Sequence, residues 1–288
     1  MHIMFSRRHP YLFFFLIVAL LMTFSIISLA IVAGIALKQS DFSDLVFEPG
    51  AGKVGVVEIK GVITESKETI NLIKRFREDD SIKAIVIRID SPGGVVGPSQ
   101  EIYREIRKTI GEKKVITSMG SIAASGGYYI AAGTDGIVAN PGTITGSIGV
   151  IMAYTNFKRL LDKIGMTPVV IKSGEFKDMG SPSREMTPSE KRVLQNFVDQ
   201  THRQFVQAIS EGRNMDITQA AALADGRIFT GEEAVKQGLV DRLGNLEDAV
   251  EWAGRLGGIE GKVSMAVSYT HLRAHETTAS ISYAVFCL

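Results

Sequence analysis

Residues 118–151 contain no Lys, Arg or Glu and a single Asp, and consist largely of Gly, Ala, Ser, Thr and β-branched residues. Small uncharged residues let one backbone segment lie closely against another, so this stretch predicts a tightly packed centre. Within it, Ser125 precedes Gly126, Gly127 and an apolar run that is typical of a helix start. N–H groups at a helix N-terminus are free and can stabilise an oxyanion. Ser125 is therefore a candidate nucleophile, although a small residue in a tight turn has the same pattern.

Strand and helix patterns alternate around this stretch. Residues 53–63, 82–89 and 115–118 have the apolar runs or alternation of strands. Amphipathic helix patterns occupy residues 69–79 and 99–108, between those strands. This alternation predicts an α/β domain with a parallel sheet.

A second set of elements is expected downstream. Thr187 and Glu190 form a capping box with Pro188 at the first helical position, which predicts a helix to about residue 210. Residues 225–250 predict a turn, a helix and a closing strand. The expected apolar face of the long helix consists of Val193, Phe197, Phe205 and Ile209.

The N-terminal region carries a membrane-anchor pattern. Residues 11–37 are 27 uncharged, mostly apolar residues, whereas a span needs about 20 and the alternative, a cleaved signal peptide, has an apolar region of about 7–15. Arg7 and Arg8 precede the run, so the positive-inside rule predicts a cytoplasmic N-terminus. We expect a cytoplasmic N-terminus and transmembrane anchor at residues 1–38, contacting membrane lipid through residues 11–37, and a linker at residues 39–53.

The C-terminal region resembles translated sequencing adapters. Residues 267–277 and 281–288 resemble in-frame translations of two sequencing adapters, with residues 278–280 as the index between them. A genuine polar tail is the alternative. We expect residues 266–288 to be an artefact and the natural chain to be truncated near Met265. Cys287, the only cysteine, lies in this tail, so the rest of the chain offers no thiolate nucleophile.

Composition argues against several other functions. The formal net charge of +1 without a basic stripe argues against nucleic-acid binding. Clustered His, Cys and carboxylate residues are missing, so we expect no metal site and no cofactor. Outside the N-terminal segment and the suspect tail, His202 is the only histidine, and its polar neighbours in the long helix predict a solvated surface position.

Four motifs follow one another in the chain: residues 90–94 (DSPGG), 119–131 (MGSIAASGGYYIA), 145–151 (TGSIGVI) and 172–182 (KSGEFKDMGSP). Together they resemble the signal peptide peptidase A family, also called protease IV, which are serine peptidases of the Clp/crotonase fold. The resemblance covers about residues 54–250 and implies repeated β-β-α units. We place the peptidase domain at residues 54–265 and expect it on the extracytoplasmic side of a bacterial inner membrane.

A serine hydroxyl is a weak nucleophile unless a neighbouring group takes its proton. Without a credible histidine, a lysine is the chemical candidate, and it must be neutral to act as a base, which burial favours. The resemblance places this base at Lys177, and Lys172 is the nearby competitor. It also matches Ser147 to the family serine that hydrogen-bonds the base.

The oxyanion hole would be formed by main-chain groups. The N–H of Gly126 and that of Gly93 or Gly94 are the candidates, because glycine lets the main chain turn an N–H toward the substrate.

The expected function is thus a membrane-anchored serine endopeptidase with a Ser-Lys dyad that hydrolyses apolar peptides such as released signal peptides. A crotonase-type acyl-CoA enzyme and a non-catalytic membrane scaffold are the alternatives. Some family members carry two copies of the fold and take serine and lysine from different halves, whereas this chain has one copy. We therefore expect a homo-oligomer in which Lys177 of one protomer reaches Ser125 of the next, with a dyad inside one protomer as the alternative.

Overall fold

The computed structural model describes residues 22–23, 52–268 and 285–287 of the chain. Apart from Met22 and Thr23, the predicted anchor at residues 11–37 lies outside these residues, as do most of the predicted linker and of the suspect tail. No helix within the described part is long and apolar enough to cross a membrane. The chain divides into two units, Met1–Gly50 and Ala51–Leu288, and the second is described below.

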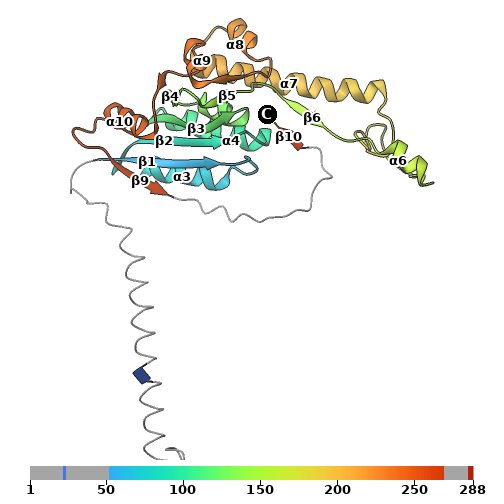
Figure 1. Ribbon diagram of the computed structural model, residues 1–288, viewed down its shortest axis with the longest axis horizontal. Coiled ribbons are helices and arrows are strands. Elements are labelled where there is room, and N and C mark those ends of the chain that lie inside the picture. Colours follow the sequence, from blue (N-terminus) through green and yellow to red (C-terminus); the bar gives the residue numbers. More distant parts are fainter. Residues whose placement is uncertain (1–21, 24–51, 269–284, 288) are drawn as a thin grey trace, which may run out of the picture. The chain divides into compact units, whose positions relative to one another are not determined.

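A mostly parallel sheet forms the centre of the second unit (Figure 1). All neighbouring strands of this sheet are parallel except β5 and β7, which are antiparallel. Off the main path, β4 (Gly136–Ala139) pairs with β3, and β8 (Arg242–Leu243) pairs with β4. The main path runs β7 (Ile228–Thr230), β5 (Ile144–Gly146), β3 (Lys114–Ala124), β2 (Ile82–Ser91), β1 (Lys53–Lys60) and β9 (Ser264–Ser268).

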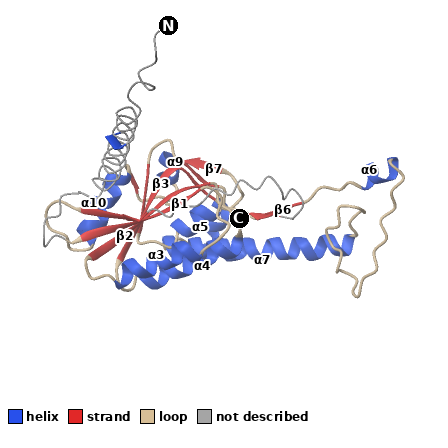
Figure 2. Ribbon diagram, turned by 90° about the horizontal axis from the view of Figure 1, so that it is seen from below, coloured by secondary structure: helices blue, strands red, loops and turns tan. Residues whose placement is uncertain are grey.

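Helices cover both faces of this sheet (Figure 2). On one face lie α3 (Lys67–Glu78), α4 (Val96–Thr109), α5 (Gly126–Ala131) and the C-terminal half of α7 (Pro188–Arg213). On the other face lies α10 (Leu246–Leu256). Within β2, Ile85 and Ile87 pack in the core under α3, α4, α5 and α7, while Ala84 and Val86 pack in the core under α10. Burial on both faces explains the continuous apolar run of this strand.

The expected α/β architecture with a parallel sheet is confirmed. The strand β3 extends well beyond the prediction, because it continues from residue 118 to Ala124. Two threonine hydroxyls support this extension: Thr143 Oγ1 donates to Gly120 O at 2.7 Å, and Thr145 Oγ1 donates to Ala123 O at 2.7 Å. Pairing with β5 continues the ladder up to Ala124.

Between α7 and α10 the chain follows the prediction only in part. The predicted turn, helix and strand correspond to residues around 226, α9 (Gly231–Lys236) and β8. The helix α8 (Ile217–Leu223) and the strand β7 precede α9, and α10 follows β8. His202 differs from the expected solvated position, because its ring is half-buried and its Nε2 lies 2.8 Å from Ala224 O.

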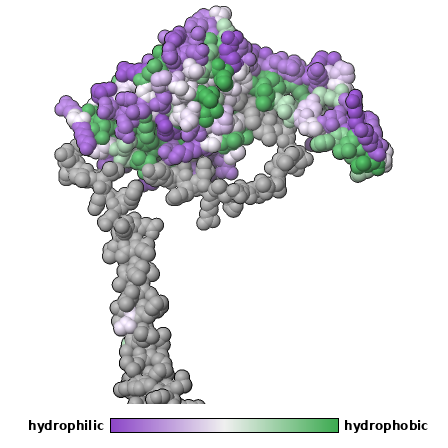
Figure 3. Space-filling view, in the orientation of Figure 1, coloured by the Kyte–Doolittle hydropathy of each residue, from purple (hydrophilic) through white to green (hydrophobic). Residues whose placement is uncertain are grey.

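An arm, defined here as residues 151–187, projects beyond the sheet (Figures 1 and 2). It contains β6 (Ile151–Ala153), which pairs antiparallel with β10 (Val285–Cys287), and α6 (Lys158–Lys163), which has no buried residue. Large apolar side chains are exposed along the arm, and Ile171 is 97% exposed. Figure 3 shows hydrophobic surface at the outer end of the arm.

The helix α7 continues the arm and differs from the prediction in its apolar face. It starts with the predicted capping box, and its C-terminal residues Phe205 and Ile209 are fully buried. Val193 and Phe197, however, are 41% and 44% exposed. The reason is that only the C-terminal half of α7 lies over the sheet.

Replacing Ile209, which lies on the buried side of α7, should destabilise the protein far more than replacing an exposed isoleucine. Ile209→Ala leaves a cavity and should lower the free energy of unfolding by about 2–5 kcal/mol. Ile217→Ala, at a position 42% exposed, should cost about 1 kcal/mol or less. Urea unfolding of the two purified variants measures both values, and equal losses would contradict this burial.

Candidate active site

Ser125 lies at the turn between β3 and α5, with φ 54° and ψ −119°. A non-glycine residue with this backbone is strained by about 1–3 kcal/mol and persists only when its surroundings hold it. Here Ser125 N donates to Gly146 O at 2.8 Å, and Ser125 O accepts from Tyr129 N at 2.8 Å. The residue is 4% exposed. A strained serine on a strand-to-helix turn is also the arrangement by which α/β-hydrolases present a nucleophile.

The glycines of the DSPGG motif pack directly against this turn. A Cβ on Gly93, which has φ +105°, would lie 2.7 Å from Gly126 N and 2.8 Å from Ser125 Cβ. Another side chain cannot fit there, so glycine is required by both conformation and space. A Cβ on Gly126 would lie 3.3 Å from Gly94 N and 2.6 Å from Ser99 Oγ. The structure thus brings Gly93, Gly94 and Gly126 together beside Ser125.

The N–H groups of these glycines differ in their bonding. Gly93 N donates to Ser91 Oγ at 3.1 Å. Gly94 forms a parallel bridge with Ile63, in which Ile63 N donates to Gly93 O and Val95 N donates to Ile63 O. In such a bridge the N–H of Gly94 itself points away from Ile63. Within the described part of the chain, the N–H groups of Gly94 and Gly126 donate to no protein atom.

Ser147 lies on the neighbouring strand end. Ala124 pairs with Gly146 in the β3–β5 ladder, so Ser125 and Ser147 follow the last paired residues of adjacent strands. Ser147 also has a left-handed backbone, with φ 50°, and its N–H donates to Arg227 O at 2.8 Å. Its side chain is half-buried.

Lys177 lies in the arm, in a series of turns between α6 and α7, where it is exposed. Its N–H donates to Gly174 O at 3.2 Å, and within the described residues its Nζ has no bonding partner. The competitor, Lys172, is already paired: its Nζ donates to Asp178 Oδ1 at 2.6 Å and to Glu175 O at 2.7 Å. The structure therefore leaves Lys177 as the available amine of this motif.

Lys177 and Ser125 do not meet within one chain. The turn of Lys177 is bonded to the N-terminus of α7, because Arg184 contacts both Asp178 and Glu190. Ser125 is joined to the other half of α7 through Tyr129, whose ring centroid lies 4.9 Å from that of Phe205. Residues 190 and 205 are 15 positions apart, or about 22 Å along an α-helix. Figure 2 shows α5 beside one end of α7 and α6 of the arm beyond the other end.

Other bases near Ser125 do not fit the role. Burial raises the pKa of Tyr129 to about 12 and also raises the pKa of Tyr128, so both phenols stay protonated at neutral pH. Tyr128 Oη donates to Leu239 O at 2.9 Å. The ring of His202 is engaged elsewhere, because its Nε2 lies 2.8 Å from Ala224 O at the end of α8. In the described part of the chain, no group of three His, Cys, Asp or Glu side chains could hold a metal ion.

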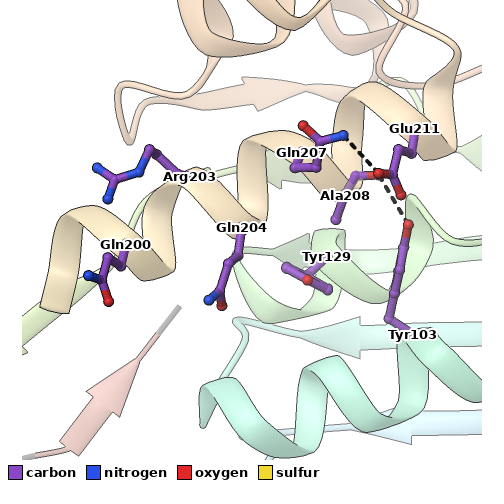
Figure 4. Close-up of a pocket in the computed structure, with 8 residues that line it drawn as sticks. All are labelled: Tyr103, Tyr129, Gln200, Arg203, Gln204, Gln207, Ala208 and Glu211. Atoms are coloured by element: carbon purple, nitrogen blue, oxygen red, sulfur yellow. Dashed lines mark hydrogen bonds between the residues drawn. The ribbon is translucent and has the colours of Figure 1, made fainter.

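A pocket of about 550 Å³ lies between α4, α5 and α7 (Figure 4). Tyr103 and Tyr129 form its base, with ring centroids 5.1 Å apart. Two hydrogen bonds join its lining residues: Gln207 Nε2 donates to Glu211 Oε1 at 2.7 Å, and Tyr103 Oη donates to Ala208 O at 3.3 Å. Ser125 is not among the lining residues. We assign no ligand to this pocket.

Two groups of residues near the site were not singled out from sequence. Ser99 is fully buried under Gly126, and no local pattern indicates a contact between residues 27 positions apart. The second group is Asp178 and Arg184, which connect Lys172 to Glu190. The four charges alternate in sign at intervals of six residues, and this regular spacing is a signal that could have found the two in the middle.

The chain matches the models of two protein families. The model of peptidase family S49 matches residues 107–260, and that of Clp protease matches residues 58–144. A Synechocystis protein named as a protease is 46% identical over 72% of this chain and 76% of its own length. A protein of Enterococcus faecium named as a signal peptide peptidase is 38% identical over 74% of this chain and 67% of its own length. Protease 4 of Haemophilus influenzae is 34% identical over 71% of this chain and 35% of its own length.

These matches confirm the resemblance to the protease IV family that the four motifs indicated, and they identify a Clp protease-like domain in the α/β fold. The model of peptidase family S49 matches more than half of the chain, and two of the relatives above are matched over two thirds or more of their own length. The chain belongs to peptidase family S49.

Proposed function

We propose that this protein is a serine endopeptidase, anchored in the bacterial inner membrane through residues 11–37, that uses a dyad of Ser125 and Lys177. The observation that carries the proposal is the turn at Ser125. A strained serine lies there beside two N–H groups, those of Gly94 and Gly126, that donate to no protein atom among the described residues. A nucleophile next to unbonded main-chain donors is the arrangement that acyl transfer requires.

The reaction follows from these groups. Ser125 Oγ attacks the scissile carbonyl carbon while its proton passes to neutral Lys177 Nζ, and the N–H groups of Gly94 and Gly126 stabilise the oxyanion. The C–N bond then breaks, the proton moves from Lys177 to the leaving amine, and an ester remains on Ser125. Water attacks this ester and gives a proton to Lys177. The ester bond breaks, and Ser125 recovers its proton. Ser147 would hold the lysine amine through its hydroxyl.

The dyad is proposed to form between protomers of a homo-oligomer. The separation along α7 supports this arrangement, because the arm carries Lys177 away from its own Ser125. A neighbouring copy in a head-to-tail ring can place its lysine where the first copy cannot. The exposed apolar side chains of the arm would be covered by that contact, and burial would favour the neutral amine.

Ser125→Ala and Lys177→Ala should each remove nearly all peptide hydrolysis, since members of a dyad act as a unit. Lys172→Ala should keep turnover, because Asp178 retains its pair with Arg184. A peptidase assay of the three purified variants measures this difference. A serine-reactive fluorophosphonate should label the wild type at Ser125, which separates a peptidase from a scaffold or an acyl-CoA enzyme. Wild-type turnover in either dyad variant would overturn the assignment.

Mixing the two inactive variants should restore activity if the site is shared. In rings of Ser125→Ala and Lys177→Ala subunits mixed in equal amounts, about a quarter of the interfaces pair an intact serine with an intact lysine. Activity should therefore recover to about a quarter of the wild-type value. The assay follows subunit exchange that is verified by differently tagged subunits. A dyad inside one protomer predicts no recovery.

The substrates are proposed to be apolar peptides from the membrane, such as signal peptides left after export. An anchor that holds the domain at the outer face of the inner membrane would place the site beside such peptides. Apolar peptides should be cleaved with a higher kcat/KM than charged peptides of equal length. Competition assays with paired peptides measure the ratio, and equal rates would indicate a peptidase without this preference.

A further inference from the structure

Four charged side chains link the turn of Lys177 to the helix α7. Lys172 Nζ donates to Asp178 Oδ1 at 2.6 Å, and Arg184 Nε donates to Asp178 Oδ2 at 2.8 Å. Arg184 also donates from both terminal nitrogens to the carboxylate of Glu190, with Nη1 2.9 Å from Oε2. The side chains of Asp178 and Glu190 are only 14% and 3% exposed. This charge chain is therefore shielded from water at both of its carboxylates.

The charge chain is also fixed to the main chain at each step. Arg184 Nη2 donates to Asp178 O at 3.2 Å, and Glu190 Oε2 accepts from Thr187 N at 2.8 Å in the capping box. Bonds from Arg184 and from the Thr187 N–H lower the pKa of Glu190 to about 2. Arg184 and Lys172 likewise hold the pKa of Asp178 well below its usual range. Both carboxylates thus stay ionised at neutral pH, and their ion pairs with Arg184 are kept.

Asp178, the residue next to Lys177, forms ion pairs with the two other cations of this region. Asp178 binds Lys172 and Arg184, while Lys177 Nζ has no partner in the part of the chain that the structure describes. The turn itself is closed by Ser181 N, which donates to Asp178 O at 3.0 Å. A base that must reach a serine on another protomer needs a fixed starting point, because an error of about 1 Å can cost about 100-fold in rate.

We infer that Asp178 and Arg184 are positioning residues for Lys177, which fix its turn to the rigid start of α7 and so set where the amine reaches the neighbouring protomer. This inference rests on the proposed Ser125–Lys177 dyad. Neither residue touches the substrate. Their role is to hold the lysine turn in place and to keep its amine free of a carboxylate partner.

Asp178→Asn should lower kcat about tenfold or more, with KM within about twofold, because the turn loses two ion pairs but keeps its shape. Asp178→Glu should recover part of this loss. The matched control is Asp162→Asn, which breaks the Lys158–Asp162 pair, also 2.6 Å long and also on the arm. This control should stay within about twofold of the wild type, since exposed pairs on a helix contribute little.

Subunit mixing separates a positioning role from a general loss of folding. Asp178→Asn subunits mixed with Ser125→Ala subunits should recover about a quarter of wild-type activity, because the first supply intact serine and the second a correctly held lysine. Misfolded Asp178→Asn subunits would give no recovery. In that case Arg184→Lys decides, since it keeps the charge but loses the fork that joins Asp178 to Glu190. A kcat for Arg184→Lys equal to the wild-type value would then refute the inference.

The outcomes also distinguish this inference from the proposed function. Turnover by Ser125→Ala or Lys177→Ala would remove the dyad and the inference with it. If both dyad variants are inactive but Asp178→Asn equals Asp162→Asn in kcat, the dyad stands and the positioning role is wrong. A fall in kcat for Asp178→Asn that is complemented by Ser125→Ala subunits supports both.

Discussion

The contact between Gly93 and the Ser125–Gly126 turn is the constraint on which the rest of the site depends. Parallel register between β2 and β3 brings their carboxyl ends to the same edge of the sheet, so the loop after β2 must pass the start of α5. It can pass only where no side chain intervenes. Because the two backbones lie so close, the N–H groups of Gly94 and Gly126 are held next to the serine. A larger residue at Gly93 would separate them.

The helix α7 joins the sheet-centred body to the arm, because its C-terminal half packs on the sheet and its N-terminal half extends beyond it. The body supplies a buried, over-determined serine turn, in which the same strand ends also hold Ser147. The arm supplies an exposed lysine on a turn stabilised by charges instead of by a core. In the proposed dyad the two groups come together only when subunits meet. Burial of the lysine at that contact penalises the charged amine and so favours the neutral form that a base needs.

The sequence predicted those features that depend on local pattern. The apolar run of β2 and the capping box at Thr187 specified their elements, because burial on two sheet faces and helix capping are readable over a few residues. Four motifs in order specified the family. The extension of β3 to Ala124 was missed, since it depends on hydroxyls from Thr143 and Thr145, which are distant in sequence. The exposure of Val193 and Phe197 was also missed, because periodicity shows that a face is apolar but not what covers it.

The exposure of half of α7 has a consequence for how the protein folds. Its C-terminal turns share the cooperative stability of the core, because Phe205 and Ile209 are packed there. Its N-terminal turns are held by the capping box and the Arg184 bonds, while Val193 and Phe197 are exposed there, so we expect their local opening free energy to be lower than that of the global transition. One continuous helix therefore belongs to two cooperative units. A partner that covers Val193 and Phe197 would join these two units into one. Binding of the partner and ordering of the N-terminal turns would then be a single, coupled equilibrium.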